Sequence, residues 1–304
     1  MKIITPLSVH GCYDVFHSNN TTYVICPYHV ILNVDHSTEI ICPHKHTRIY
    51  SVPSFKVNIN GTTVTPNVYE IPKKQLALST LEKDSSKYVY HWLNYHSQNG
   101  TGYFFIYDNN SSDEEFEKIV KTAEPFDGII FRWNYIFIDE VSGRSAQTTQ
   151  QNHTLYISRH SIDRVALLDL DEYIVTYQPL SLDDVLKPRL TMLWWLWFGA
   201  MTDSTDPRSY TRCKRRHEEQ WYHKMIVDPT YVDLVSVHNV LLPDRIESTA
   251  VRPEFAVLHH YRGLNEYRGK CPETKHESCE FCECTNYQLN KHYNHTSTSS
   301  TPGK

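Results

Sequence analysis

The 304-residue sequence lacks a long apolar run, a hydrophobic signal core and a large net charge. Its strongest apolar run, Leu190 to Met201, is shorter than the roughly 20 residues that a membrane span needs. The start of the sequence has no signal core, so an exported form would need a signal or anchor outside it. A formal charge of −5 argues against nucleic acid as a partner. With 40% hydrophobic and 21% charged residues, the sequence is typical of a globular protein with an ample core.

Two features favour the secretory pathway. Acceptor sequences for N-linked glycans, Asn-x-Ser/Thr, start at eight positions: Asn19, Asn20, Asn60, Asn99, Asn109, Asn110, Asn152 and Asn294. The eight cysteines are an even number, which suits an oxidising compartment. Four of them are close together near the C-terminus: Cys271, Cys279, Cys282 and Cys284. These four fit zinc in number but match no common zinc module in spacing, so disulfides of open pairing are favoured.

The hydrophobic patterns predict an α/β fold that follows a small β-rich region. Residues 1–75 contain short β-branched runs separated by prolines, which is typical of strands joined by turns. From residue 76, candidate strands alternate with helical patterns up to about residue 168, which predicts a parallel sheet covered on both faces. The Trp-rich run from Leu190 is predicted to be a buried strand, and residues 263–304 a cysteine-containing tail, flexible at its end.

The acidic sequence Asp169-Leu170-Asp171-Glu172 directly follows the predicted buried strand 165–168. Three carboxylates at one strand end repel one another unless a cation or hydrogen-bond donors compensate them. In an extended chain, side-chain alternation would place Asp169 and Asp171 on one side, where both face one metal ion and a diphosphate. Mg²⁺ or Mn²⁺ suits such oxygen ligands. A helix cap or a solvated loop is the alternative interpretation.

Several sequence blocks occur in order around this segment. Residues 88–96 read Y-V-Y-H-W-L-N-Y-H, 105–113 read F-I-Y-D-N-N-S-S-D, and 166–174 read A-L-L-D-L-D-E-Y-I. Further on come H-K-M-I-V-D-P at 223–229, V-H-N at 237–239 and H-Y-R at 260–262. In this order they resemble the E-W-x-x-Y-H, Y-D-N-x-S-x-D, D-x-D-E, H-K-x-I-x-x-P, V-H and H-Y-R elements of glycosyltransferase family 92. The resemblance covers about residues 76–262.

This resemblance implies a GT-A-like, Rossmann-type domain that binds a nucleotide sugar. The implied reaction is a metal-dependent, inverting transfer of a hexose, galactose from UDP-galactose, onto a glycan of a glycoprotein or glycolipid. Mn²⁺ or Mg²⁺ would be the cofactor, and the Golgi lumen the location. Any membrane attachment would use an anchor that this sequence does not contain.

The resemblance also suggests roles for single residues. Asp171 would be the direct metal ligand, and Asp169 would share the metal or hold the ribose. His238 would be the ligand from the far side of the site, with His260 as its rival. Lys224 and Arg262 would stabilise the leaving diphosphate, since a positive charge favours the negative charge that develops there.

Further candidates concern the donor, the base and the acceptor. Asp84 and Asp108 are expected to contact the donor. Inversion needs a carboxylate base, for which Glu218 and Glu219 are preferred and Asp203 and Asp206 are the other candidates. Stacking of the acceptor sugar is expected on the Trp-rich strand, from Trp194 and Trp197.

Three departures from the family pattern leave alternatives open. Lys83-Asp84-Ser85 stands where the family has K-N-E, His91 where it has the glutamate of its helix motif, and Asn152-His153-Thr154 where it has N-x-C. The alternative function is therefore a catalytically inactive, glycan-binding relative. A metal-dependent phosphoesterase that uses the same carboxylates is a third hypothesis.

Overall fold

The computed structural model describes residues 1–41, 47–133, 142–177, 181–198, 212–215, 223–241, 248–252, 255–261 and 282–283. For 142–145, 196–198, 212–215, 248–249 and 282–283, it describes the backbone only. Within these ranges, no helix is both long and apolar enough to cross a membrane.

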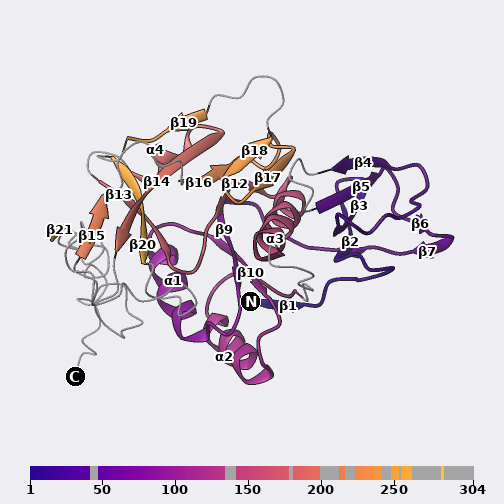
Figure 1. Cartoon of the computed structure of the whole chain (residues 1–304), viewed down its shortest axis with the longest axis horizontal. Coiled ribbons are helices and arrows are strands. Elements are labelled where there is room, and N and C mark those ends of the chain that lie inside the picture. The colour runs from indigo at the N-terminus through magenta and orange to yellow at the C-terminus, as the bar shows by residue number, and fades with distance from the viewer. Residues whose placement is uncertain are drawn as a thin grey trace, which may run out of the picture.

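A large sheet forms the centre of the protein (Figure 1). Its middle consists of four parallel strands, in the spatial order β11 (Gly128–Arg132), β10 (Tyr103–Asp108), β9 (Lys74–Glu82) and β12 (Ile162–Leu167). Strand β1 (Lys2–Ile4) pairs in parallel outside β11, although a β-rich unit separates it from β9 in sequence. The first strand of the chain therefore belongs to the large sheet.

Beyond β12 most strand pairs are antiparallel, although β14 pairs in parallel with β19 and β20, so the sheet is mixed rather than wholly parallel. Strand β16 (His223–Val227) pairs antiparallel with both β12 and the Trp-rich strand β14 (Leu190–Phe198). The remaining strands on this side are β13 (Glu172–Thr176), β15 (Arg212–Arg215), β19 (Ser248–Ala250), β20 (Ala256–Tyr261) and β21 (Cys282–Glu283). A separate hairpin consists of β17 (Leu234–Ser236) and β18 (Asn239–Leu241).

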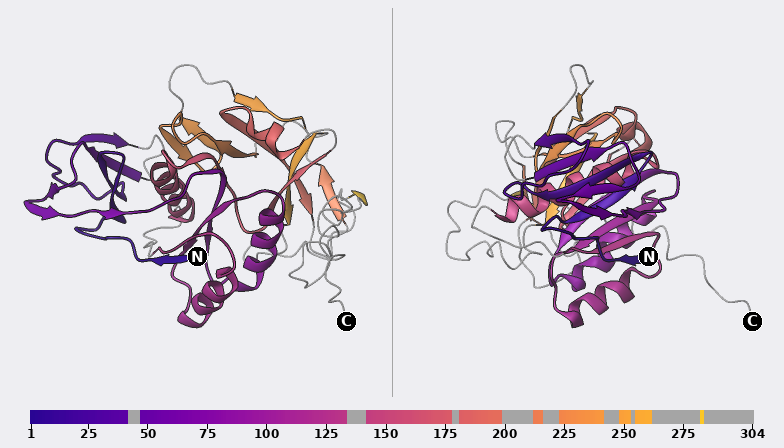
Figure 2. Two further views of the ribbon diagram at one scale, coloured as in Figure 1. Left: turned by 180° about the vertical axis from the view of Figure 1, so that it is seen from behind. Right: turned by 90° about the vertical axis from the view of Figure 1, so that its right-hand side faces the viewer.

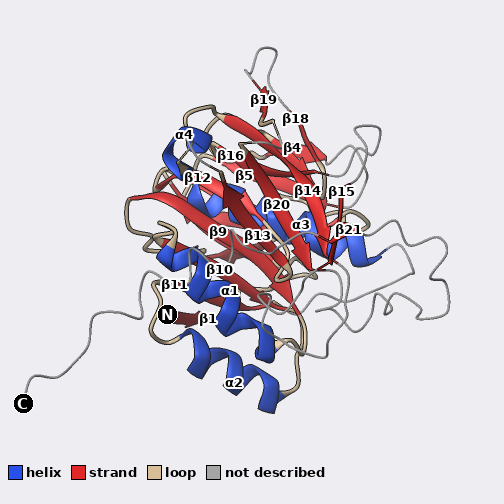
Figure 3. Ribbon diagram, turned by 90° about the vertical axis from the view of Figure 1, so that its left-hand side faces the viewer, coloured by secondary structure: helices blue, strands red, loops and turns tan. Residues whose placement is uncertain are grey.

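Helices cover both faces of the parallel strands, as the alternating pattern predicts (Figure 3). On one face, α1 (Ser86–Gln98) and α2 (Asp113–Ala123) contribute to a core with alternate strand residues such as Leu76 and Leu78. On the other face, α3 (Ser142–Ser158) packs with the intervening residues, such as Ala77. This division follows from the two-residue period of a strand. A short helix, α4 (Leu182–Leu186), precedes β14.

The predicted β-rich region forms a second, smaller sheet at one end of the molecule (Figure 2). Its strands are β4 (Thr38–Ile41), β5 (Thr47–Val52), β3 (Thr21–Pro27), β2 (Asp14–Ser18) and β8 (Asn67–Val68), in spatial order. A hairpin of β6 (Val57–Ile59) and β7 (Thr62–Val64) adjoins them. Core residues of this sheet join those of α3, so the helix is enclosed between the two sheets.

The N-glycan acceptors among the described residues differ in burial, and Asn99 is intermediate. Asn19, Asn20 and Asn60 are exposed, and each has a positive φ, as residues in tight turns do. Asn109 and Asn152 are only 3% and 0% exposed, so the folded protein has no room for a glycan there. Both cysteines whose side chains are described, Cys12 and Cys26, are buried and free. Burial raises the pKa of the Cys12 thiol to about 11.

Candidate active site

The sheet topology identifies one edge where a ligand is expected. The chain leaves β9 for β10 on one side, and β12 later returns on the other side of β9. The order of the parallel strands therefore reverses between β9 and β12. In open α/β sheets, ligands bind in the crevice outside the carboxyl ends of the strands at such a reversal.

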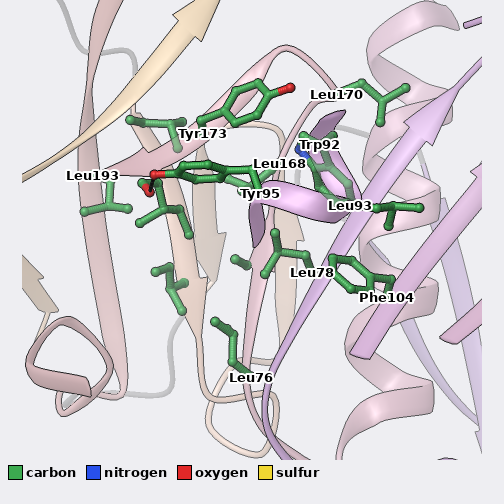
Figure 4. Packing of buried hydrophobic residues seen from close by; sticks show 14 of the residues in the cluster. Leu76, Leu78, Trp92, Leu93, Tyr95, Phe104, Leu168, Leu170, Tyr173 and Leu193 are labelled. Atoms are coloured by element: carbon green, nitrogen blue, oxygen red, sulfur yellow. Dashed lines mark hydrogen bonds between the residues drawn. The ribbon is translucent and has the colours of Figure 1, made fainter. Parts of the chain in front are cut away.

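The acidic segment lies at the carboxyl end of β12, next to this reversal. Leu168 and Leu170 are buried in the core, which anchors the segment (Figure 4). The Glu172 amide donates to the Asp169 carbonyl at 3.1 Å, and the Asp169 amide donates to the Glu172 carboxylate at 2.8 Å. These bonds close a turn at 170–171. The segment is therefore a turn and not the extended chain that was predicted.

Lys224, on the neighbouring strand β16, lies between two of the carboxylates. Its Nζ is 3.1 Å from Asp169 Oδ2 and 3.6 Å from Glu172 Oε2. Lys224 and Glu172 are almost completely buried, whereas the Asp169 side chain is 22% exposed. The other Asp169 oxygen accepts a hydrogen bond from the side-chain amide of Gln147 in α3. Asp169 thus has a partner on each of two elements.

Asp171 has a different set of partners, on β20. His260 Nε2 is 3.2 Å from Asp171 Oδ2, and the Tyr261 amide donates to the Asp171 carbonyl at 2.8 Å. The antiparallel pairing of β13 with β20 places Glu172 opposite His260, which explains this approach. The Trp195 ring packs edge-on against the His260 ring, with centroids 4.6 Å apart. His260, the alternative to His238 as a metal ligand, thus contacts the Asp171 carboxylate.

Burial and charge act against each other in this cluster. Burial raises the pKa of Glu172 to about 8, although the nearby Lys224 opposes the shift. Burial lowers the pKa of Lys224, but Asp169 and Glu172 outweigh it and raise the pKa overall. A carboxyl group with a pKa of about 8 is mostly protonated at neutral pH, so Glu172 adds little negative charge to the cluster in this state.

His238 lies close to the cluster but is held differently. It follows β17 in the hairpin, and its Nδ1 donates to the His223 carbonyl at 3.1 Å. Its ring packs edge-on against Trp195, at 5.5 Å between centroids. Burial, followed by the charge of Lys224, lowers the pKa of His238 to about 4, so the imidazole is neutral at physiological pH. A neutral imidazole can coordinate a metal ion.

The two tryptophans of β14 whose side chains are described, Trp194 and Trp195, have different neighbours. Trp194 and Trp195 are partly exposed rather than fully buried, which differs from the prediction for this strand. Trp195 contacts both His238 and His260, whereas Trp194 packs near His223, with centroids 6.1 Å apart. Strand alternation explains why adjacent tryptophans meet different neighbours. Of these two, Trp195 is therefore the one that contacts the histidines beside the acidic segment.

A second acidic group lies at the carboxyl ends of β9 and β10. Register pairing places Asp108 between Glu82 and Arg132, and Arg132 forms an ion pair with Asp108 at 3.0 Å. Burial, followed by the charge of Asp108, raises the pKa of Glu82 well above its usual value. The carboxylate of Asp84 accepts a bond from the Ser112 amide at 2.9 Å, just before α2. Asp84 and Asp108 thus lie at the carboxyl ends of the parallel strands, where a ligand is expected, and both are bound to other residues of the protein.

The chemistry of the main cluster suits a divalent cation, although a complete ligand set is not assembled. Carboxylate oxygens and neutral imidazole are ligands that Mn²⁺ accepts. Throughout the described ranges, however, no group of three or more His, Cys, Asp or Glu side chains is arranged to hold a metal ion. Lys224 and His260 instead pair with the oxygens of Asp169 and Asp171.

The structure places only part of the predicted site. Outside the described residues lie Arg262, Glu218, Glu219, Asp203, Asp206 and the side chain of Trp197. Conversely, sequence reasoning did not select Gln147 or Glu172 as site residues. Glu172 is part of the acidic motif itself, so its place could have been expected. Gln147 has no such signal, because its contact with Asp169 depends on how α3 packs.

Fold and site together define a mixed-sheet α/β protein with an acidic cluster where nucleotide ligands commonly bind. Residues 77–190 match the family model described as Glycosyltransferase family 92. A family 92 protein of Oryza sativa subsp. japonica is 25% identical over 204 residues, which are 62% of this chain and 33% of that protein. One from Arabidopsis thaliana is 25% identical over 213 residues, 62% of this chain and 35% of that protein.

The matched part of the chain is thus similar to glycosyltransferase family 92. The chain spans about a third of the length of these two relatives. HddC from Yersinia pseudotuberculosis is a solved structure that matches 60% of this chain and 92% of its own. Its TM-score of 0.34 and identity of 12% are too low to carry an argument about the fold.

Proposed function

We propose that this chain is a metal-dependent, inverting glycosyltransferase with a GT-A-like fold, which transfers a hexose from a nucleotide sugar to a glycan. Galactose from UDP-galactose is the proposed donor sugar. The observation that carries the proposal is the cluster of Asp169, Asp171 and Glu172 at the strand reversal, inside the segment that matches the family. A location in the secretory pathway is part of the same proposal.

The proposed metal site uses Asp171 and Asp169, with a histidine as a further ligand. His238 is neutral and near the cluster, and His260 already contacts Asp171. A bound Mn²⁺ would stabilise the negative charge that develops on the leaving diphosphate. The metal would share Asp169 with Lys224, whose Nζ lies 3.1 Å from the carboxylate, so both positive charges would stand beside the same diphosphate.

The protein's own groups would contribute orientation and charge. Lys224 is fixed by burial, so it needs little reorganisation to stabilise an anion beside it. Trp195 offers a partly exposed aromatic ring beside the cluster, and Trp194 lies next to it on the other face of β14. Either ring could stack on a sugar. The base would be Glu218 or Glu219, with Arg262 as a second cation near the donor.

The sharpest test is thermal unfolding with UDP or UDP-galactose, each with and without Mn²⁺. A ligand at about 100 times its dissociation constant adds about 2.7 kcal/mol of stability, which is a few degrees for a chain of this size. We expect a shift that needs both nucleotide and metal. Asp171→Asn should abolish this shift.

Asp163→Asn is the matched control. Asp163 is an exposed aspartate on the same strand, β12, at its amino end and away from the cluster. Each variant is compared with its own ligand-free melting temperature, so differences in stability cancel. An equal ligand-induced shift in wild type and Asp171→Asn would contradict the metal role of Asp171.

One observation supports the alternative function, a catalytically inactive protein that binds glycans. Asp84, within the altered Lys83-Asp84-Ser85 segment, uses its carboxylate to bind the Ser112 amide. A carboxylate engaged in this way is less free to contact a donor. Binding of glycans without any effect of UDP-galactose and Mn²⁺ would favour this alternative over the transferase.

A further inference from the structure

Helix α3 is unusual because its polar side chains are buried. The helix lies between the large sheet and the smaller one, and its residues Gln150, Asn152, His153 and Thr154 are at most 1% exposed. Each finds a partner on another element. Gln150, for example, donates to Ser79 of β9. A buried polar helix of this kind fixes the elements around it, because leaving any partner unsatisfied is costly.

Asn152 makes the most specific of these contacts. Its Oδ1 accepts a bond from the Val235 amide at 3.0 Å, and its Nδ2 donates to the Val235 carbonyl at 2.7 Å. The side-chain amide thus satisfies both backbone groups of one residue, as a neighbouring strand would. The same Nδ2 also donates to the Thr148 carbonyl at 2.8 Å, one turn earlier in α3. The Asn152 amide is therefore held rigidly on the helix.

Val235 is the central residue of β17, and His238 lies in the tight connection that follows. Register pairing of Ser236 with Asn239 leaves only Val237 and His238 between the two strands of the hairpin. Fixing the backbone at Val235 therefore fixes the place of His238, three residues later. Tyr156, further along α3, adds a second bond to the hairpin by donating to the Asp233 carbonyl at 3.0 Å.

The same helix holds the other side of the site. Gln147 of α3 donates to Asp169, and it precedes Asn152 by five residues, or about 7.5 Å along a helix. The distance between these two anchors is set by one rigid element. Asp169 and His238 are 69 residues apart in sequence, and α3 holds both of them in place.

We propose that Asn152 is a positioning residue that sets, through Val235, where His238 stands relative to Asp169. The expected effect on nucleotide and metal binding rests on the proposed function, whereas the effect of Asn152 on the position of His238 does not. The proposal also explains why a side chain in a glycan-acceptor sequence is completely buried: its amide is used inside the protein.

The test compares Asn152→Asp with Gln150→Glu. Asn152→Asp keeps the size of the side chain but removes the donor to Val235 and Thr148. Gln150→Glu makes the same chemical change in the same buried helix, away from the hairpin. Backbone hydrogen exchange is measured at residues 234–241, and UDP affinity is measured by calorimetry with Mn²⁺ present. Asn152→Ala, which adds no buried charge, replaces Asn152→Asp if that variant does not fold.

For the Asn152 variant we expect hairpin exchange to become roughly tenfold faster or more, and UDP affinity to fall about tenfold, as loss of a buried hydrogen bond predicts. Gln150→Glu should leave hairpin exchange within about twofold of wild type. Unchanged hairpin exchange in the Asn152 variant, or equal acceleration in both variants, would overturn the proposal. If wild type binds no UDP, the proposed function fails, while the exchange result still decides the role of Asn152.

Discussion

The buried ion pair of Lys224 leads to a quantitative prediction for Lys224→Met. Lys224 is 1% exposed and lies 3.1 Å from Asp169 and 3.6 Å from Glu172, which is fully buried. Methionine fills a similar volume but leaves both carboxyl groups without their cation. Removing one partner of a buried ion pair costs about 3–5 kcal/mol. Because Asp169 is 22% exposed and water screens part of its charge, we expect a loss near the lower end, about 3 kcal/mol.

The measurement is urea-induced unfolding of wild type and variant at the same pH and salt. Lys187→Met is the matched control, since Lys187 pairs with Asp184 at 2.7 Å but is 75% exposed. Exposed pairs contribute little, so this control should lose much less stability than Lys224→Met. A second change, Glu172→Gln in the Lys224→Met background, should recover part of the loss by removing an uncompensated acid. Equal losses in Lys224→Met and Lys187→Met would refute the reasoning.

Two further predictions concern the scaffold. A Cβ on Gly128 would lie 2.2 Å from the Phe104 carbonyl oxygen, so Gly128→Ala should cost about 2–3 kcal/mol in urea unfolding. Gly61→Ala, at φ +80° with open space around it, should cost only about 1 kcal/mol. A larger loss of stability in Gly61→Ala than in Gly128→Ala would contradict this prediction. Burial lowers the pKa of His96 to about 3, so it stays neutral when folded and takes up a proton on unfolding below pH 6.5. Stability should therefore fall by about 2 kcal/mol more from pH 6.5 to 5 in wild type than in His96→Gln, and parallel pH profiles would disprove it.

Much of the fold is readable from local patterns. Periods of two and of about 3.6 residues depend on neighbours in sequence, so strands β9 to β12 and helices α1 and α2 match the predicted segments. The S-x-x-E pattern at 112–115 predicts a capping box at the start of α2, and the Ser112 side chain does accept a hydrogen bond from the Glu115 amide. The reciprocal bond of a capping box is not formed, because Glu115 binds Ser86 instead.

Periodicity also predicts an amphipathic segment at about 147–160, where α3 lies, and this helix shows where periodicity is insufficient. In α3 the polar side chains are buried together with the apolar ones, because the helix is covered by a sheet on each side. Whether a helix face meets water or another sheet depends on elements far away in sequence. Asp14 of β2, which pairs with His153 at 2.8 Å, is 139 residues away.

The sequence by itself determined that an acidic segment follows a buried strand of an α/β protein, because strand, turn and carboxylates are adjacent in the chain. Tertiary structure decided which partners those carboxylates have. Lys224 reaches Asp169 through the pairing of β12 with β16, and His260 reaches Asp171 from 89 residues away through the pairing of β13 with β20. Strand order and register, which no local pattern encodes, therefore fix the charge balance of the site.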